Sequence, residues 1–189
     1  MKNKSEVIFD KNTIEFVTVA AEFCSFLEKT NERSRDEFVN TALKFLPLLY
    51  LKASLISPCE RMGIDELEQS VSEGDYEFIR TSVKQVMGSQ DDYLEVFTPD
   101  IQYSEGALTC EISEDMADIY QDVRDFVEMF KTENNITMND ALVTCKEHFA
   151  DYWGQKLVNS MRALHDAKYN QHDEEDNGKT QTGYADNDD

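Results

Sequence analysis

Apolar residues recur every three or four positions along most of the chain, which is the spacing that one face of an α-helix produces. The clearest case runs from about Thr137 to Lys168, and we expect a long helix there, opened by Thr137-x-x-Asp140. Its apolar face consists of Leu142, Cys145, Phe149, Trp153, Leu157, Ser160 and Leu164. Polar residues border that face, namely His148, Tyr152, Gln155, Asn159, Arg162 and Asp166. Such a border either binds a ligand or hydrogen-bonds neighbouring helices together.

The same periodicity predicts four further helices. They span about Asp10–Thr30, Ser34–Ile56, Glu73–Met87 and Ser113–Phe130, with Ser113 as the cap of the last. Ser34-x-x-Glu37 is a capping box, Pro47 should bend the second helix, and Gly88 should end the third. Weak alternation in 93–97 and 108–112 predicts extended segments or a short hairpin.

These elements predict an all-α fold, a helical bundle of about five long helices with a long acidic connection between helices three and four. We expect a single helical domain over residues 1–169 and a disordered acidic tail over 170–189. A shift of 103 residues puts Phe16 on Ile119 and Phe23 on Phe126, and it aligns the two capping-box patterns. We therefore hypothesise two pseudo-repeated helical hairpins.

Composition supports helix and a reducing compartment. Only 7 Gly and 3 Pro occur, too few for a turn-rich β sandwich. The four cysteines form no CxxC pair, which fits reduced thiols. No targeting segment is visible, and the most apolar run, 42–56, is too short to cross a bilayer. We expect a cytoplasmic protein.

The net charge of −21 disfavours direct binding to nucleic acid or to an anionic membrane. The tail explains only part of this charge, because 170–189 holds seven acids and Lys179. Between residues 89 and 125, eleven acids accompany only Arg124. A solvated acidic surface is one interpretation, and a partner with a basic surface or a metal ion is the other.

The fourth predicted helix carries a row of carboxylates, Glu114, Asp118, Asp122 and Asp125, at helical spacing. Such rows hold Mg²⁺ or Mn²⁺ in helical hydrolases, and they also form the solvated face of amphipathic helices. Because no second acidic motif completes a metal site, we expect no metal. Asp118 and Asp122 are the candidates if one binds.

Two further residues were candidates for chemistry. Lys52 lies in the apolar segment 48–55, so its ammonium either reaches solvent or pairs with a carboxylate, for which Asp118 or Asp122 is expected. His148 has Cys145 and Asp151 three residues away, but these two face opposite sides of a helix, so they do not complete a metal site. No nucleophile elbow, phosphate loop or HExxH pair occurs. We therefore assign no catalytic residue and expect no cofactor.

The candidate ligand-binding residues are Lys52, Tyr152, Trp153, Gln155, Asn159 and Arg162. Gly154 lies among them, and mid-helix glycine costs about 1 kcal/mol relative to alanine, so close packing or ligand access would explain it. The alternative is a structural hydrogen-bond network that satisfies buried backbone at the Pro47 kink and in the long acidic connection. In either case we expect this edge to face helix two near Pro47 or helix four.

Four segments resemble an uncharacterised family of bacterial helical proteins, described as a domain of unknown function. They are Thr13–Leu27, Leu46–Ser54, Ile112–Phe126 and Tyr152–Leu164. The resemblance covers roughly residues 1–169. It implies a single helical bacterial domain and carries over no activity and no catalytic residue.

The sequence therefore favours a non-enzymatic protein-binding or regulatory module, whose partner is another protein, one with a basic surface. Two alternatives stay open. One is a metal-dependent hydrolase that uses Mg²⁺ or Mn²⁺ on a nucleotide or other phosphate substrate. The other is an acidic nucleic-acid mimic that occupies a basic protein groove.

Overall fold

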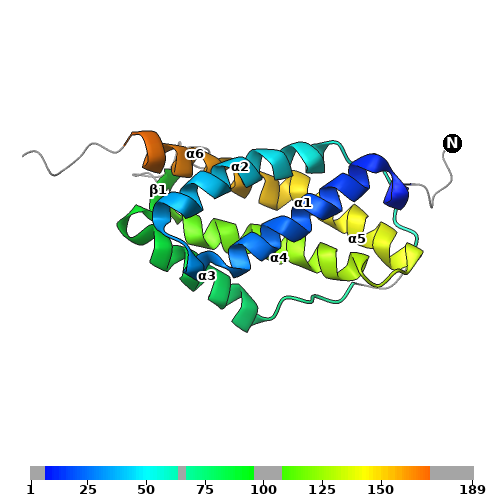
Figure 1. Ribbon diagram of the computed structural model, residues 1–189. Helices are drawn as coiled ribbons and strands as arrows, with labels where there is room; N and C mark the ends of the chain where they lie inside the picture. The colour runs from blue at the N-terminus through cyan, green and yellow to red at the C-terminus, as the bar shows by residue number, and fades with distance from the viewer. Residues whose placement is uncertain (1–6, 64–66, 96–107, 171–189) are drawn as a thin grey trace, which may run out of the picture.

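The computed structural model describes residues 7–63, 67–95 and 108–170. Within these ranges six α-helices form an elongated bundle (Figure 1). They are α1 Lys11–Glu28, α2 Arg35–Ser54, α3 Glu73–Met87, α4 Ile112–Phe130, α5 Asn135–His148 and α6 Gly154–Tyr169. Strands β1 Asp92–Glu95 and β2 Leu108–Glu111 form one small sheet in the described ranges. The predicted all-α class is confirmed.

Helix α4 lies at the centre of the bundle, because it packs against α1, α3, α5 and α6. In Figure 1, α1 runs diagonally across the front of α4. Phe16 of α1 contacts Phe126 of α4 with ring centroids 5.1 Å apart, and both side chains are buried. Phe26 of α1 stacks on Phe38 of α2 at 5.3 Å. The other helices pack around this aromatic centre.

Helices α2 and α3 both begin at capping boxes. The predicted box is present at α2, where the Glu37 amide donates to Ser34 Oγ and the Ser34 amide donates to the Glu37 carboxylate. Ser72 and Asp75 form a second box at α3 that we did not predict. Gly88, at φ 60°, ends α3 as expected, because this left-handed backbone favours glycine.

The two strands form the predicted hairpin pairing, antiparallel with Tyr93 opposite Cys110. The prediction that Ser113 caps the fourth helix is wrong. α4 starts at Ile112 directly after β2, and Ser113 lies inside it. Asp91, just before β1, takes the capping role by accepting hydrogen bonds from the Ser113 amide at 2.8 Å and the Ser113 hydroxyl at 2.6 Å. The pairing of β1 with β2 brings Asp91 next to the start of α4, so the cap comes from a residue that is distant in sequence.

The single helix predicted for 137–168 is interrupted. A π-helical turn, Phe149–Trp153, joins α5 to α6, and its end is closed by the Gly154 amide donating to the carbonyl of Phe149. Such a turn holds one residue more than an α-turn, so it rotates the faces of the residues that follow it. The predicted apolar face nevertheless persists through the turn, since Trp153, Leu157, Ser160 and Leu164 are all buried.

The start of α5 also differs from the prediction. Asn134 is the cap, and its side chain accepts from the amides of Ile136 and Thr137. Asp140, predicted to complete a capping box with Thr137, instead accepts from the amides of Met62 and Gly63, each at 2.7 Å. Asp140 thereby fixes the segment after α2 against α5.

The expected partner of Lys52 is wrong. Its ammonium pairs with Glu15 of α1 at 2.6 Å, not with Asp118 or Asp122 of α4. The reason is the packing order, since α2 lies mainly against α1 and α6. The Lys52 side chain is 20% exposed, so it is neither fully buried nor free in solvent.

Helix α1 packs against α2 and helix α4 packs against α5, as two helical hairpins would. Whether the two pairs superpose is not tested, so the two-hairpin repeat stays a prediction. One part of the argument for it is wrong, since Ser34 caps α2 whereas Thr137 lies within α5. A search of the described helices found none with the length and apolarity that a membrane span requires.

Replacing Gly154 by Ala should lower stability. An added Cβ would meet the carbonyl oxygen of Phe149 and lie 3.0 Å from its ring, so overpacking of about 1–3 kcal/mol should exceed the usual helix preference for alanine. Gly74→Ala is the matched control, because at Gly74 the nearest atom is Ser72 Oγ at 3.6 Å. That variant should gain about 0.4–1 kcal/mol. Urea denaturation measures the free energy of unfolding of both variants. A gain in stability for Gly154→Ala as well as for Gly74→Ala would contradict the close contact at Gly154.

Candidate functional site

A pocket of about 530 Å³ opens along one side of α4, between α4, α5, Arg61 and residues 67–69. One wall carries Asp118, Asp122 and Asp125 of α4. We call this pocket the acidic groove. Its apolar lining consists of Leu67, Phe126, Met129, Ala141 and Cys145, and its remaining polar lining includes Arg61, Thr144, His148 and Tyr152.

Three of the four carboxylates in the predicted row are not solvated, whereas Glu114 is exposed and does not line the groove. The side chains of Asp118 and Asp122 are only 12% and 17% exposed. Burial raises the pKa of the Asp122 and Asp125 carboxyls above their ordinary value, although hydrogen bonds partly oppose this. Helical spacing put these residues on one face, as the sequence indicated. That α5, Arg61 and residues 67–69 line the same groove could not be seen from the spacing.

Lys156 of α6 contacts two carboxylates in the N-terminal half of α4, Asp115 and Asp118. Its ammonium lies 3.0 Å from Asp115 Oδ1 and 2.7 Å from Asp118 Oδ2. Burial alone would lower the pKa of Lys156, but its hydrogen bonds to the two carboxylates and their charges raise it overall. The ammonium also lies 5.2 Å from the centre of the Tyr152 ring, within the range of a cation–π contact.

Two tyrosines complete this network from other elements. Tyr76 of α3 donates its hydroxyl to Asp118 at 2.9 Å, and Tyr93 of β1 donates to Asp115. Burial and the hydrogen bond to a carboxylate raise the pKa of both phenols, so they stay neutral donors. Lys156, Tyr76, Tyr93 and Asp115 were not among our candidate residues, because their proximity depends on four separate elements.

His148 stands at the mouth of the acidic groove. Its Nδ1 lies 2.5 Å from Asp122 Oδ1, and its side chain is 53% exposed. Helical spacing could not pair these two residues, because they are 26 positions apart on different helices. Cys145, which we had considered beside His148, is buried in the core, and Asp151 is exposed. The carboxylate that actually contacts His148 comes from α4.

Backbone amides bind Asp125, the last carboxylate of the row toward the C-terminus of α4. Asp125 Oδ1 accepts from the amides of Ser70 at 2.6 Å and Val71 at 2.8 Å. Across the groove, Arg61 donates to the Thr144 hydroxyl at 2.7 Å. These contacts hold Arg61 against α5 and residues 70–71 against α4, so the groove has a defined opposite wall.

The candidate residues of the predicted polar edge divide between two places. Tyr152 lines the acidic groove, where burial raises its pKa to about 12. Gln155, Asn159 and Arg162 instead face the hairpin. Gln155 donates to Asn159 at 2.9 Å, Asn159 donates to Glu95, and Arg162 donates to the Leu94 carbonyl at 2.6 Å. This part of the edge is a hydrogen-bond network that reaches backbone of the acidic connection at β1, as one alternative predicted. The expectation that the edge faces helix two near Pro47 or helix four is wrong for these three residues.

Two other candidates lie outside the groove. Trp153 is fully buried, and its Nε1 donates to the carbonyl of Cys145 at 3.1 Å. Its ring packs on Phe149 with centroids 4.7 Å apart. Lys52 lies on α2 beside Glu15 of α1. Trp153 is therefore a core residue, and neither it nor Lys52 is among the residues that line the groove.

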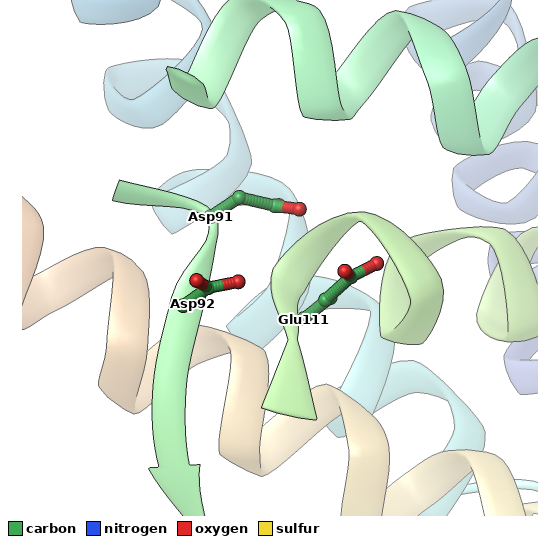
Figure 2. Close-up of side chains that lie close together, drawn as sticks. All are labelled: Asp91, Asp92 and Glu111. Carbon is green, nitrogen blue, oxygen red and sulfur yellow. The ribbon is translucent and has the colours of Figure 1, made fainter. Parts of the chain in front are cut away.

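A second acidic cluster lies at the base of the hairpin. Figure 2 shows Asp91, Asp92 and Glu111, whose carboxylate oxygens lie within 4.8 Å of one another. Glu111 pairs with Arg80 at 2.9 Å and Lys84 at 2.6 Å, while Asp91 accepts from Ser113. Two of the three carboxylates are thus engaged by side chains that stabilise the hairpin and the start of α4.

The acidic groove has limited capacity for a metal ion. Asp118 already contacts an ammonium and a phenol, which occupy the space where a cation would bind. Asp122 and Asp125, separated by less than one helical turn, leave one carboxylate oxygen each without a hydrogen-bond donor among the described residues. The groove can therefore accept hydrogen bonds from a positively charged group at this pair.

The fold and the groove define an all-α acidic bundle with a carboxylate-lined pocket. The chain belongs to the family described as a domain of unknown function, DUF5063, whose pattern matches residues 7–170.

Among solved structures, the chain is similar to protein BF1032 from Bacteroides fragilis, a structural-genomics target with a crystal structure. The two share 51% sequence identity with a TM-score of 0.80, over 88% of this chain and 98% of that one. No functionally curated protein matches the chain.

Lys156→Met should strongly destabilise the protein at neutral pH. The variant leaves Asp115 and Asp118 without their cation, and losing one partner of a buried ion pair costs about 3–5 kcal/mol. Because the fold raises the pKa of Lys156, the wild-type contribution is complete below pH of about 10.4 and is lost only as pH rises further.

Urea denaturation at pH 7.5 and pH 4.5 tests this expectation. The difference should be smaller at pH 4.5, because burial raises the pKa of Asp115 and its protonated form needs no cation. Lys168→Met, at an exposed lysine on the same helix, is the control and should change stability little. Equal losses in the two variants would refute the role of the network.

Asp122→Asn should raise the melting temperature at pH 7.5. A carboxyl whose pKa is raised on folding stabilises the fold below its ordinary pKa, and that stability is lost as pH rises through the folded pKa. Asparagine removes the buried charge, so the gain should shrink as pH falls toward 4. Asp36→Asn, at an exposed acid, should show little change. A lower melting temperature for Asp122→Asn would mean that the His148 contact outweighs burial.

Proposed function

We propose that the chain is a non-enzymatic binding domain that docks a positively charged segment of another protein in the acidic groove. The observation that carries this proposal is the row of half-buried carboxylates on α4, held at the edge of an open pocket of about 530 Å³. Four acidic side chains line the pocket against the single guanidinium of Arg61. A pocket with this charge attracts cations and repels phosphates.

Burial of these carboxylates supports binding over a purely solubilising role. A carboxylate that only keeps a protein soluble gains nothing from partial burial, which raises its pKa and lowers stability. Groups kept in such an unfavourable state cluster at functional sites. Asp122 and Asp125 fit that description.

The two alternative functions receive less support. In a hydrolase that uses Mg²⁺ or Mn²⁺, Asp118 and Asp122 would be ligands, yet Asp118 contacts Lys156 and Tyr76, and Asp122 contacts His148. A nucleic-acid mimic would need free carboxylates along an open surface. The α4 row lies in a groove instead. We keep protein binding as the proposal.

Capture from lysate of the native cells tests it. Immobilised wild-type protein should retain basic proteins at 50 mM salt and release them at 500 mM, because screening weakens exposed charge interactions. Asp122→Lys should abolish the capture. Asp36→Lys changes the net charge equally at an exposed site of α2 and should leave capture intact.

Two results would count against the proposal. One is capture that is the same for both variants, which would mean that only the overall charge matters. The other is a calorimetric titration in which Mg²⁺ or Mn²⁺ binds the wild type and not Asp122→Asn, which would favour the hydrolase. Melting curves of both lysine variants establish that each is folded at the capture temperature.

A further inference from the structure

We infer that the acidic groove takes a single alkylammonium or alkylguanidinium group, with its charged end at Asp122 and Asp125 and its apolar stem along Phe126 and Met129. This inference rests on the proposed function and specifies the chemistry of what binds there. It also applies to a free amine, which the proposed function does not include.

A side chain of this protein already binds in this way next to the groove, at Asp115 and Asp118. The Lys156 side chain extends from α6 past the Tyr152 ring and ends between Asp115 and Asp118, which are three residues apart on α4. An aliphatic stem, an aromatic neighbour and two carboxylates therefore bind one cation here. Nothing about this arrangement requires the lysine to belong to the same chain.

The acidic pair is repeated seven residues further along α4. Asp122 and Asp125 have the same three-residue spacing as Asp115 and Asp118. Seven residues are nearly two helical turns, so both pairs lie on similar sides of α4, about 10 Å apart along its axis. The first pair holds Lys156. In the described part of the chain, no lysine or arginine forms an ion pair with the second.

In the second pair, Asp122 and Asp125, one oxygen of each carboxylate has a hydrogen-bond donor among the described residues and the other has none. His148 contacts only Oδ1 of Asp122, and the amides of Ser70 and Val71 reach only Oδ1 of Asp125. Among the described residues no donor reaches either Oδ2. A guanidinium or ammonium supplies donors and the matching charge together.

The pocket beside the pair also fits an apolar stem. Phe126 and Met129 follow the acidic pair on α4, and Leu67 and Ala141 also line the pocket. Phe126 and Ala141 are almost fully buried, so the partly buried Met129 and Leu67 offer most of the apolar surface. A volume of about 530 Å³ lies within the range of small-ligand sites. A small inorganic cation would leave that apolar surface in water, so an amphipathic cation fits better.

Titration of the ¹⁵N-labelled full chain with n-butylguanidinium tests the inference by NMR. Amide shifts should move at α4 and α5 around the groove. The neutral analogue n-butylurea has nearly the same shape and should cause no such change. In Asp122→Asn the dissociation constant should rise at least tenfold, about 1.4 kcal/mol, while Asp36→Asn should bind as the wild type does. Equal binding of the urea, or unchanged binding in Asp122→Asn, would overturn the inference.

A second arm distinguishes the source of the cation. A blocked Gly-Leu-Arg-Leu-Gly peptide is compared with its citrulline counterpart. Tighter binding of the arginine peptide than of n-butylguanidinium identifies a protein side chain as the ligand, and equal binding identifies a free cation. Both results support the ligand class, whereas binding of the citrulline peptide as tight as that of the arginine peptide contradicts it.

Failure of this inference differs from failure of the proposed function. If basic proteins are captured through Asp122 but n-butylguanidinium does not bind, the proposed function stands and the single-cation pocket is wrong. If n-butylguanidinium binds and no protein is captured, the pocket stands and the protein partner is wrong.

Discussion

The ammonium of Lys156 joins parts of the molecule that are distant in sequence. It pairs with both Asp115 and Asp118 of α4, and those carboxylates in turn accept from Tyr93 of β1 and Tyr76 of α3. An ion pair with hydrogen bonds is directional, whereas hydrophobic burial is not. The partly buried Lys156 ammonium therefore adds a fixed contact between α6 and α4 to the apolar packing of α6, and the hairpin and α3 meet at the same carboxylates.

The acidic groove follows from this arrangement. Lys156 occupies Asp115 and Asp118, and the next pair on α4, Asp122 and Asp125, lines the groove together with residues of α5, Arg61 and residues 67–69. His148 and two backbone amides satisfy this pair only in part. One row on α4 thus stabilises the fold at one end and offers hydrogen-bond acceptors at the other. The similarity to protein BF1032, at 51% identity, extends to the fold and supplies no further role.

Local sequence predicted the elements well wherever the stabilising contact was local. The Ser34 capping box, the bounds of α3 and the left-handed Gly88 could be read from neighbouring residues. Predictions failed where a distant residue supplied the contact. Asp91 caps α4 from across the hairpin, and Asp140 holds the segment after α2 instead of capping its own helix.

The sequence by itself determined the all-α class, the buried faces of α1 and α4, and the carboxylate row, because these depend on helical periodicity. It also put Tyr152 among the candidate residues. Only the tertiary structure decided that this row lines a groove and that Lys156 and His148 contact it. The physical reason is that these contacts join residues 26 to 41 positions apart, through packing of separate helices that periodicity does not encode.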